Sequence, residues 1–154
     1  MTTMLTLAEL EASSGRDLGT SEWHEITQQQ IDQFAEATGD HQWIHVDPEA
    51  AASGPFGTTV AHGYITLSML PMLLSEVVSV SDAVMGVNYG TEKIRFTSPV
   101  PSGSRVRLHA TLARAERRGP SVIWTVGVHV EIDGKEKPAL VGEVVYMAAG
   151  APPA

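Results

Sequence analysis

The sequence contains no cysteine among its 154 residues. Disulfides, thiolate nucleophiles and thiolate metal ligands are therefore excluded as sources of stability or of chemistry. No apolar run is long enough to cross a bilayer. Residues 1–20 also lack the basic region followed by an apolar stretch that marks a secretory signal. We therefore expect a soluble cytoplasmic protein that does not enter a membrane.

Positive charge is scarce, since 10 Lys and Arg residues face 18 Asp and Glu residues, for a formal net charge of -8. This balance disfavours nucleic-acid binding, which needs a basic face. It leaves small anionic ligands open, because a local basic pocket can sit on an acidic protein. The length suits a single domain, 1–154, with residues 1–20 expected as an N-terminal extension and residues 149–154 as a disordered tail.

The most informative stretch holds two histidines and two aspartates within the eight positions from Asp40 to Asp47. A helix is predicted just before it, over residues 27–38. A capping box begins at Thr27, and Gly39 suits the left-handed residue that ends such a helix. The ionisable side chains that follow are therefore expected in a loop.

The strongest apolar segment, His62–Val80, is predicted as a helix buried on all sides, with a kink at Pro71. Beyond it the pattern changes to alternating apolar and polar residues, which is typical of strands with one face on a core. Helices followed by an antiparallel meander indicate an α+β fold, a curved sheet packed on one long central helix. The predicted strands are Val84–Thr97 with a break near Gly90, Arg105–Leu112, Val122–Ile132 and Leu140–Ala148; shorter elements are a helix at Leu5–Leu10, a strand at Glu22–Ile26 and a helix at Glu49–Ser53.

Asp40 and His45 lie in the expected loop, where both side chains can point at one spot. A carboxylate beside an imidazole can hold one water between them, and the imidazole exchanges a proton near neutral pH. A structural alternative is that Asp40 caps a helix end and His45 is a buried, hydrogen-bonded ring. A metal site is another alternative, with His41 and His45 as ligands and Asp40 or Asp47 completing the set. Asp47 already has a structural role, as N-cap of the next helix.

Gly63 follows His62 at the start of the apolar helix. The first N–H groups of a helix are unpaired and carry partial positive charge, and glycine lets another group approach the backbone closely. These groups could hold a developing oxyanion. The alternative is that glycine only lets the helix pass beneath the sheet.

Polar residues on the first long strand are candidates for ligand contacts. Lys93 and Arg95 are basic positions that could touch an anionic ligand, although most exposed cations are simply solvated. Asn88 and Tyr89 interrupt an otherwise apolar part of the same strand. They are candidates on that ground alone.

Together these segments resemble the MaoC-like dehydratases, also called (R)-specific enoyl-CoA hydratases, of the hot-dog fold. The signature of that family is Gly-Asp, then Asn-Pro-Leu-His, then Asp, with a downstream His-Gly. Gln42-Trp43 stands here in place of Asn-Pro, as in NodN-like variants, and the resemblance spans roughly Ile26 to Tyr146. The matching segments are Gly39-Asp40 through His45-Val46-Asp47, Phe56-Gly57, Ala61-His62-Gly63-Tyr64, and Phe96 with Pro99-Val100 and Gly103.

The resemblance implies a reaction and roles for these residues. Asp40 and His45 would bind one water, His45 as general base, and the Gly63 N–H would polarise the thioester carbonyl of a trans-2-enoyl substrate carried on CoA or an acyl-carrier protein. The product would be an (R)-3-hydroxyacyl thioester of fatty-acid metabolism. No metal or other cofactor is implied, and two copies would form a homodimer. The expected substrate contacts are His62 and Phe56, together with Asn88, Tyr89, Lys93 and Arg95 contributed from the partner side of the dimer.

Two other functions fit the same fold. A hot-dog thioesterase would hydrolyse the thioester, and it usually places a carboxylate on or beside the central helix, where Glu76 is the only acid. A non-catalytic accessory protein would bind the acyl thioester without turnover.

Overall fold

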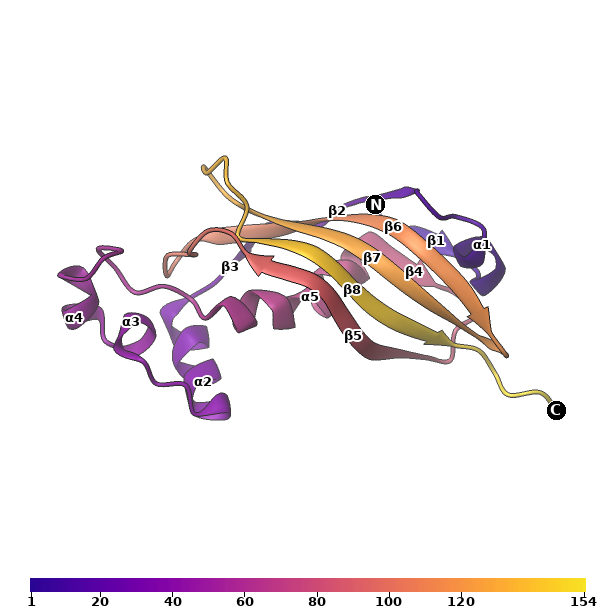
Figure 1. Cartoon of the computed structure of the whole chain (residues 1–154), viewed down its shortest axis with the longest axis horizontal. Coiled ribbons are helices and arrows are strands. Elements are labelled where there is room, and N and C mark those ends of the chain that lie inside the picture. The colour runs from indigo at the N-terminus through magenta and orange to yellow at the C-terminus, as the bar shows by residue number, and fades with distance from the viewer.

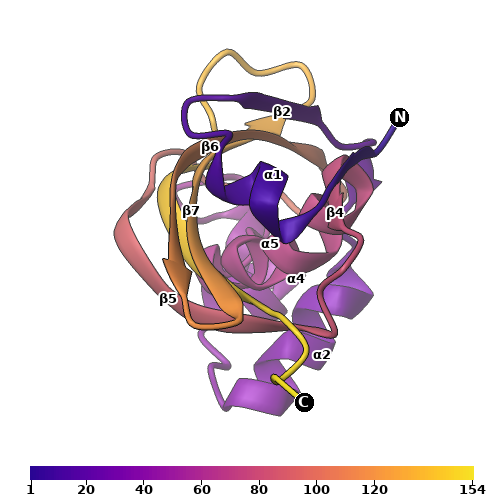
Figure 2. The ribbon, with the colours of Figure 1, turned by 90° about the vertical axis from the view of Figure 1, so that its right-hand side faces the viewer.

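A curved antiparallel sheet wraps around one helix in the computed structural model, which describes residues 1–154. Figure 2 shows α5 (Gly63–Val77) lying in the concave side of the sheet. The strand order is β2-β6-β7-β8-β5, with β3 also paired to β6. The predicted α+β class, with a curved sheet on a long helix, is confirmed. The strands are β2 (Asp17–Thr20), β3 (His24–Glu25), β5 (Met85–Phe96), β6 (Arg105–Arg118), β7 (Ser121–Ile132) and β8 (Leu140–Ala149).

The alternating residues of β6 and β7 build the inner face of the sheet. Val106 and Leu108 of β6 are fully buried, and they pair in register with Ile132 and Val130 of β7. β6 continues to Arg118, past the predicted end at Leu112, because a bulge between Leu112 and Arg114 shifts the register and pairing with β7 then resumes. The alternation that predicted the strand breaks at that bulge.

The N-terminal residues 1–20 are packed into the domain. β1 (Thr3–Leu5) pairs in parallel with β4 (Val78–Val80), and α1 (Leu7–Glu11) begins at a capping box made by Thr6 and Glu9. Leu10 is fully buried in the core. The short helix predicted at Leu5–Leu10 thus begins two residues later, at Leu7. The apolar helix predicted to reach Val80 ends at Val77, because Val78–Val80 pair with β1 as a strand.

Three short helices project beyond one end of the sheet (Figure 1). The predicted capping box opens α2 (Gln28–Thr38), and Gly39 ends it with a φ of 82°. α3 (Trp43–Val46) and α4 (Pro48–Ala52) follow. The loop predicted from Asp40 to Asp47 is thus only partly a loop, since its middle forms one helical turn that contains His45.

One face of α5 is open in the single chain, contrary to the prediction of a helix buried on all sides. Leu70, Leu73 and Val77 are buried against the sheet. Tyr64 is 66% exposed and Met72 is 42% exposed on the opposite side. The helix continues through Pro71, which lies on this exposed side. Ser68 and Ser75 are exposed on this side too, but its larger side chains are apolar, and apolar surface of this kind often marks an interaction site.

β5 forms one edge of the sheet and carries two irregularities. Its register with β8 shifts between Asn88 and Gly90, which confirms the predicted break near Gly90, and again between Glu92 and Arg95. At the second shift Lys93 has a φ of 55°, a left-handed conformation that is rare for residues other than glycine. Beyond Ala149, residues 150–154 form neither helix nor strand. No helix in the structure has both the length and the apolar character needed to span a bilayer.

Candidate active site

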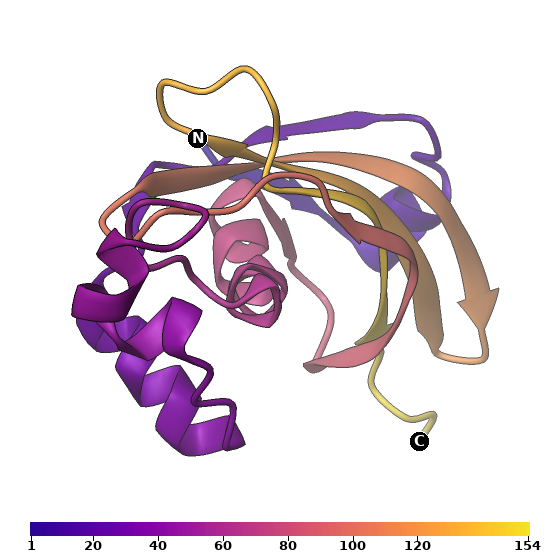
Figure 3. The ribbon, with the colours of Figure 1, turned by 60° about the vertical axis from the view of Figure 1, so that its left-hand side comes forward.

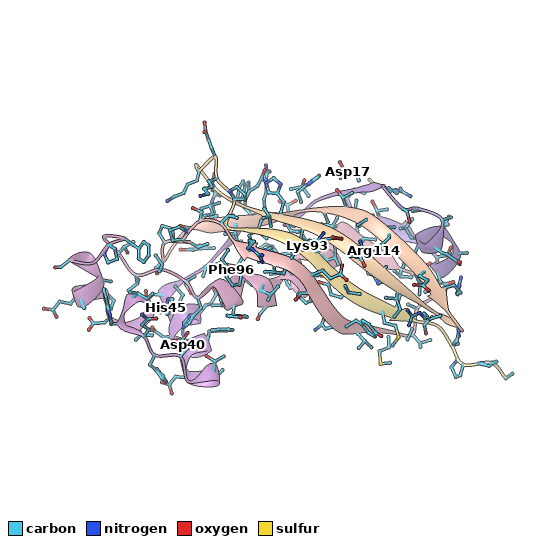
Figure 4. The ribbon with its side chains drawn as sticks, in the orientation of Figure 1. Asp17, Asp40, His45, Lys93, Phe96 and Arg114 are labelled. Carbon is cyan, nitrogen blue, oxygen red and sulfur yellow. The ribbon has the colours of Figure 1, made fainter.

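Asp40, His45 and His62 converge where α2, α3 and the start of α5 meet. One ring nitrogen of each histidine and one carboxylate oxygen of Asp40 all lie within 4.8 Å of one another. Figure 4 shows Asp40 and His45 close together at the end of the molecule that α2, α3 and α4 occupy. The sequence predicted that Asp40 and His45 meet, and the structure adds His62.

The His45 ring is held in one tautomer by the backbone. Its Nδ1 lies 2.6 Å from the carbonyl oxygen of Val60. Because a carbonyl only accepts, Nδ1 donates, and Nε2 of the neutral ring carries the lone pair. Its helical turn is fixed by a bond of 2.9 Å from the Val60 N–H to the Ile44 carbonyl, and by a bond of 2.8 Å from the Gln28 side chain to the His45 carbonyl. An imidazole nitrogen with a free lone pair is therefore held in a well-fixed turn.

His62 contacts both His45 and Asp40 from the interior of the protein. It is 3% exposed, and its ring stacks on that of His45 with 3.9 Å between centroids and 24° between planes. Its Nε2 donates to the carbonyl oxygen of Asp40 over 2.9 Å. The Phe34 ring also packs against His62, with 5.0 Å between centroids. The buried His62 Nδ1 has no hydrogen-bond partner. This placement behind His45 favours a supporting role over the substrate contact expected from the sequence.

The Asp40 carboxylate lies on the solvent-exposed side of the same cluster. Its side chain is 55% exposed, and one oxygen lies 4.0 Å from the Nε2 of His62. The chain turns into this position at Gly39, and a bond of 3.4 Å from the Gln42 N–H to Asp40 Oδ1 is the only hydrogen bond that the carboxylate accepts within the chain. The structural alternative of a helix cap applies to Asp47 rather than to Asp40, because Asp47 accepts the Ala50 N–H over 3.0 Å.

Polar atoms at this spacing can share one water. Two hydrogen bonds of roughly 2.8 Å reach across a gap of this size. The stacked rings suit a metal ion less well, because lone pairs in nearly parallel planes do not point at one centre. The predicted metal partner His41 lies near Glu36, at 3.6 Å, outside the cluster. Proton transfer through water is thus the chemistry that the geometry favours.

Gly63 opens α5 beside the cluster, and its backbone N–H has no acceptor in the chain. A Cβ at this position would lie 2.6 Å from the ring of Phe96. Phe96 comes from β5 and covers the helix start, so only glycine fits beneath it. A cavity of about 230 Å³, lined by Gly63, Thr66 and Phe96 among others, lies against this end of the helix. A carbonyl oxygen that reached this N–H would meet an unpaired donor.

The other predicted substrate contacts lie outside the cluster of Asp40, His45 and His62. Asn88 and Tyr89 line a cavity beside α5. Arg95 precedes Phe96, so strand alternation puts it on the opposite face of β5. Its guanidinium donates to the carbonyl of Ile94. Phe56, in the loop after α4, and Lys93, in the β5 bulge, are both exposed. Their contacts with a substrate stay predictions.

The MaoC-like domain matches residues 9–132. The chain belongs to the MaoC-like family. It is 49% identical over 146 residues to the 3-hydroxyacyl-thioester dehydratase Z of Mycobacterium tuberculosis strain H37Rv, covering 94% of this chain and 97% of that protein. It is 48% identical over 139 residues to nodulation protein N of Rhizobium leguminosarum bv. viciae, covering 88% of this chain and 86% of that protein.

The structural comparison places this MaoC-like chain in the hot-dog fold. The unliganded (R)-hydratase PhaJ1 of Pseudomonas aeruginosa superposes with a TM-score of 0.74 at 22% identity, covering 97% of this chain and 95% of that one. The predicted hot-dog architecture is confirmed. With its relatives, the family assignment makes this chain an enzyme of the hydratase and dehydratase type, a hydro-lyase.

Two contacts of the site were not predicted from the sequence. His62 is close to His45 in space although 17 residues separate them, and nothing in the spacing predicts that their rings stack. The Val60 carbonyl that sets the His45 tautomer carries no side-chain signal at all. Only the pairing of Val60 with the turn of α3, a long-range backbone contact, brings it into place.

Proposed function

We propose that this chain adds water reversibly to trans-2-enoyl thioesters to give (R)-3-hydroxyacyl thioesters of fatty-acid metabolism. The observation that carries the proposal is the His45 ring, whose Nε2 is left with a lone pair beside the Asp40 carboxylate. The names of the relatives, a 3-hydroxyacyl-thioester dehydratase and an (R)-hydratase, support this reaction. The acyl group would arrive on CoA or on an acyl-carrier protein.

In this mechanism Asp40 and His45 hold one water between them. His45 takes a proton from that water as its oxygen bonds to the β-carbon of the enoyl group. The proton passes through Asp40 to the α-carbon, so the addition is proton-neutral overall. The Gly63 N–H donates to the thioester oxygen, where negative charge develops, and one such donor typically contributes ~10²–10³ in rate. Because the thioester itself makes the β-carbon electrophilic, we propose that no cofactor takes part.

The open face of α5 supports a homodimer in which a second copy covers it. The cluster of Asp40, His45 and His62 lies at an end of the molecule where the mapped cavity reaches Gly63 but not Asp40 or His45. A second copy that packed on the exposed side of α5 and on edge strand β5 would complete the walls of the site. The substrate would then lie at the subunit interface.

A thioesterase finds less support in the geometry. Glu76, the only acid on α5, lies ~20 Å from Gly63 along the helix axis at a rise of about 1.5 Å per residue. Its carboxylate is occupied by His24 at 2.7 Å and by the Glu22 N–H at 3.0 Å. A carboxylate committed to these contacts is not available as a base at the start of the helix.

The test is an assay with crotonyl-CoA that follows two signals in one sample. Hydration removes the conjugated-enoyl absorbance and releases no thiol, whereas thioester hydrolysis releases free CoA, which a thiol reagent detects. We expect loss of absorbance without thiol, and an (R)-3-hydroxybutyryl product on chiral analysis. Thiol release at the same rate as the loss of absorbance would show that the activity is thioester hydrolysis and not hydration.

The accessory-protein alternative needs a separate measurement. A saturated acyl-CoA, which cannot be hydrated, is titrated into the protein by calorimetry. Binding of this compound together with no turnover of crotonyl-CoA would favour a non-catalytic role. Turnover in the absorbance assay would exclude it.

A further inference from the structure

Two cavities lie along α5, between the helix and the concave side of β5 and β8. The first, of about 410 Å³, includes Leu67, one turn after the start of the helix. The second, of about 450 Å³, lies farther along the helix and includes Leu74. Pro71, Asn88 and Tyr146 line both cavities. The two spaces therefore share a wall, and their lining residues on α5 run from Leu67 to Ser75, in the direction away from Gly63.

The shared wall carries two polar side chains, the exposed Asn88 and the partly buried Tyr146, beside the apolar Pro71. Asn88 of β5 and Tyr146 of β8 are directly opposite in the sheet register. Neither the Asn88 amide nor the Tyr146 hydroxyl has a hydrogen-bond partner within the chain. Burial raises the pKa of Tyr146 to about 12. The hydroxyl therefore stays protonated at neutral pH and remains a donor.

A third donor lies next to this pair. The ring of Trp124 packs against that of Tyr146 with 5.4 Å between centroids, and it lines the second cavity. Its indole N–H is buried without an acceptor. Buried donors without partners are uncommon, and each needs an explanation. An acceptor oxygen supplied by a bound molecule would be one.

We propose that the two cavities hold the distal part of the acyl chain, and that the natural substrate carries a hydroxyl or keto oxygen there, bound by Asn88 and Tyr146. The inference rests on the proposed hydratase function and names the substrate class for it. Pro71, at the shared wall, lies ~12 Å from Gly63 along the helix, at about 1.5 Å per residue. A chain whose thioester carbonyl sits at Gly63 therefore reaches this wall only when it is of medium length or longer.

The energetic reason is the cost of covering polar groups. A plain hydrocarbon chain across this wall would displace water from the Tyr146 hydroxyl and the Asn88 amide without replacing its hydrogen bonds. Leaving a polar group unsatisfied costs about 1–3 kcal/mol when it is buried. A chain with an oxygen at that point restores a partner. A site that presents hydrogen-bonding groups discriminates most strongly against analogues that lack the matching atom.

The experiment compares pairs of trans-2-enoyl-CoA substrates over a series of chain lengths. Each pair consists of a plain chain and the same chain with a terminal hydroxyl. For short chains we expect the plain member to be equal or better. For chains that reach Asn88 and Tyr146, we expect kcat/KM to favour the hydroxylated member by roughly tenfold, the lower part of the range set by one unsatisfied group.

Two variants assign the preference to these residues. Tyr146→Phe keeps the ring against Trp124, and Asn88→Leu keeps a side chain of similar size. Each should reduce the preference for the hydroxylated chain, and the double variant should abolish it. Ser75→Ala is the matched control, since Ser75 also lines the second cavity but its hydroxyl already donates to the Met72 carbonyl over 2.6 Å. It should leave the preference unchanged.

Three results would overturn the inference. One is a plain chain preferred at every length. Another is a preference that survives in the double variant. A third is exclusion of all longer chains, which would mean that a second copy of the chain fills the cavities.

Turnover of crotonyl-CoA, which is too short to reach the wall, reports on the proposed function alone. If that turnover is absent, calorimetry with plain and hydroxylated saturated acyl-CoAs still decides whether the wall prefers oxygen. Tighter binding of the hydroxylated compound supports the inference, and equal or weaker binding overturns it.

Discussion

At the scale of single residues, two backbone carbonyls decide how the histidines of the site are oriented. The Val60 carbonyl fixes the proton of His45 on Nδ1, and the Asp40 carbonyl fixes the proton of His62 on Nε2. His45 is left with a free lone pair on its outer nitrogen, and His62 is left with an unpartnered nitrogen in the interior. The two rings have the same chemistry but leave different nitrogens without a partner, because their backbone partners differ.

His62 is expected to act by positioning Asp40 and His45. His62→Phe keeps an aromatic ring under His45 but loses the bond to the Asp40 carbonyl. Such a bond contributes about 0.5–1.5 kcal/mol, so we expect kcat to fall roughly threefold to tenfold while KM stays nearly constant. His62→Gln, which can present an N–H to the same carbonyl, should recover part of the loss. Steady-state kinetics of both variants at several pH values are the measurement.

The outcome for these two variants separates positioning from simple folding. Thermal melts give their stability independently of the kinetics. If both variants lose activity only in proportion to the fraction unfolded, His62 is a structural residue and no more.

Gly63 should tolerate no side chain while Phe96 is present. Gly63→Ala puts a methyl group 2.6 Å from the Phe96 ring, and overpacking of this kind typically costs about 1–3 kcal/mol. We expect a lower melting temperature for Gly63→Ala, and recovery of most of it in the double variant with Phe96→Leu. Melting temperatures that show no coupling between the two changes would contradict the contact.

At the scale of elements, the sequence predicted those helices and strands whose position is set by neighbouring residues. The capping box and Gly39 placed α2 correctly, and alternation placed β6 and β7. The turn of α3 was missed because four residues without a capping side chain leave no local signal. β1 and β4 were missed because a three-residue strand exists only through its pairing partner elsewhere in the chain.

The bulge in β5 gives a prediction at this scale. Lys93 adopts a left-handed conformation there, which costs a residue with a Cβ roughly 1–2 kcal/mol. Lys93→Gly should therefore raise the free energy of unfolding, by up to about 1 kcal/mol once the greater freedom of glycine in the unfolded chain is counted. Urea denaturation measures it. A clear loss of stability would mean that the lysine side chain itself holds the bulge.

At the scale of the whole molecule, the single chain leaves an apolar helix face uncovered. Figure 3 shows α5 nearly end-on, with the sheet above it and to the right and no element directly below it. Hydropathy alone predicted full burial of this helix, because it reports that a residue is apolar and not which molecule covers it. Tyr64 and Met72 are therefore the residues that hydropathy placed incorrectly for the isolated chain.

The proposed homodimer follows from this open face. Tyr64→Glu places a charge on its exposed surface near the start of α5, and we expect the variant to sediment as a monomer where the native chain sediments as a dimer. Met4→Glu is the matched control, since Met4 is also highly exposed but lies on β1, away from that face. Analytical ultracentrifugation is the measurement. Equal masses for native chain and Tyr64→Glu would contradict the predicted interface.

The most direct test of the proposed chemistry is the rate of crotonyl-CoA hydration by Asp40→Asn, by His45→Gln and by the chain with both changes. Because the two side chains act on one water, each single change should lower kcat by ~10²–10⁴, and the double change should lower it no further than the more damaging single one. Losses that multiply in the double variant, or a single variant with nearly native activity, would show that the two residues do not share that water.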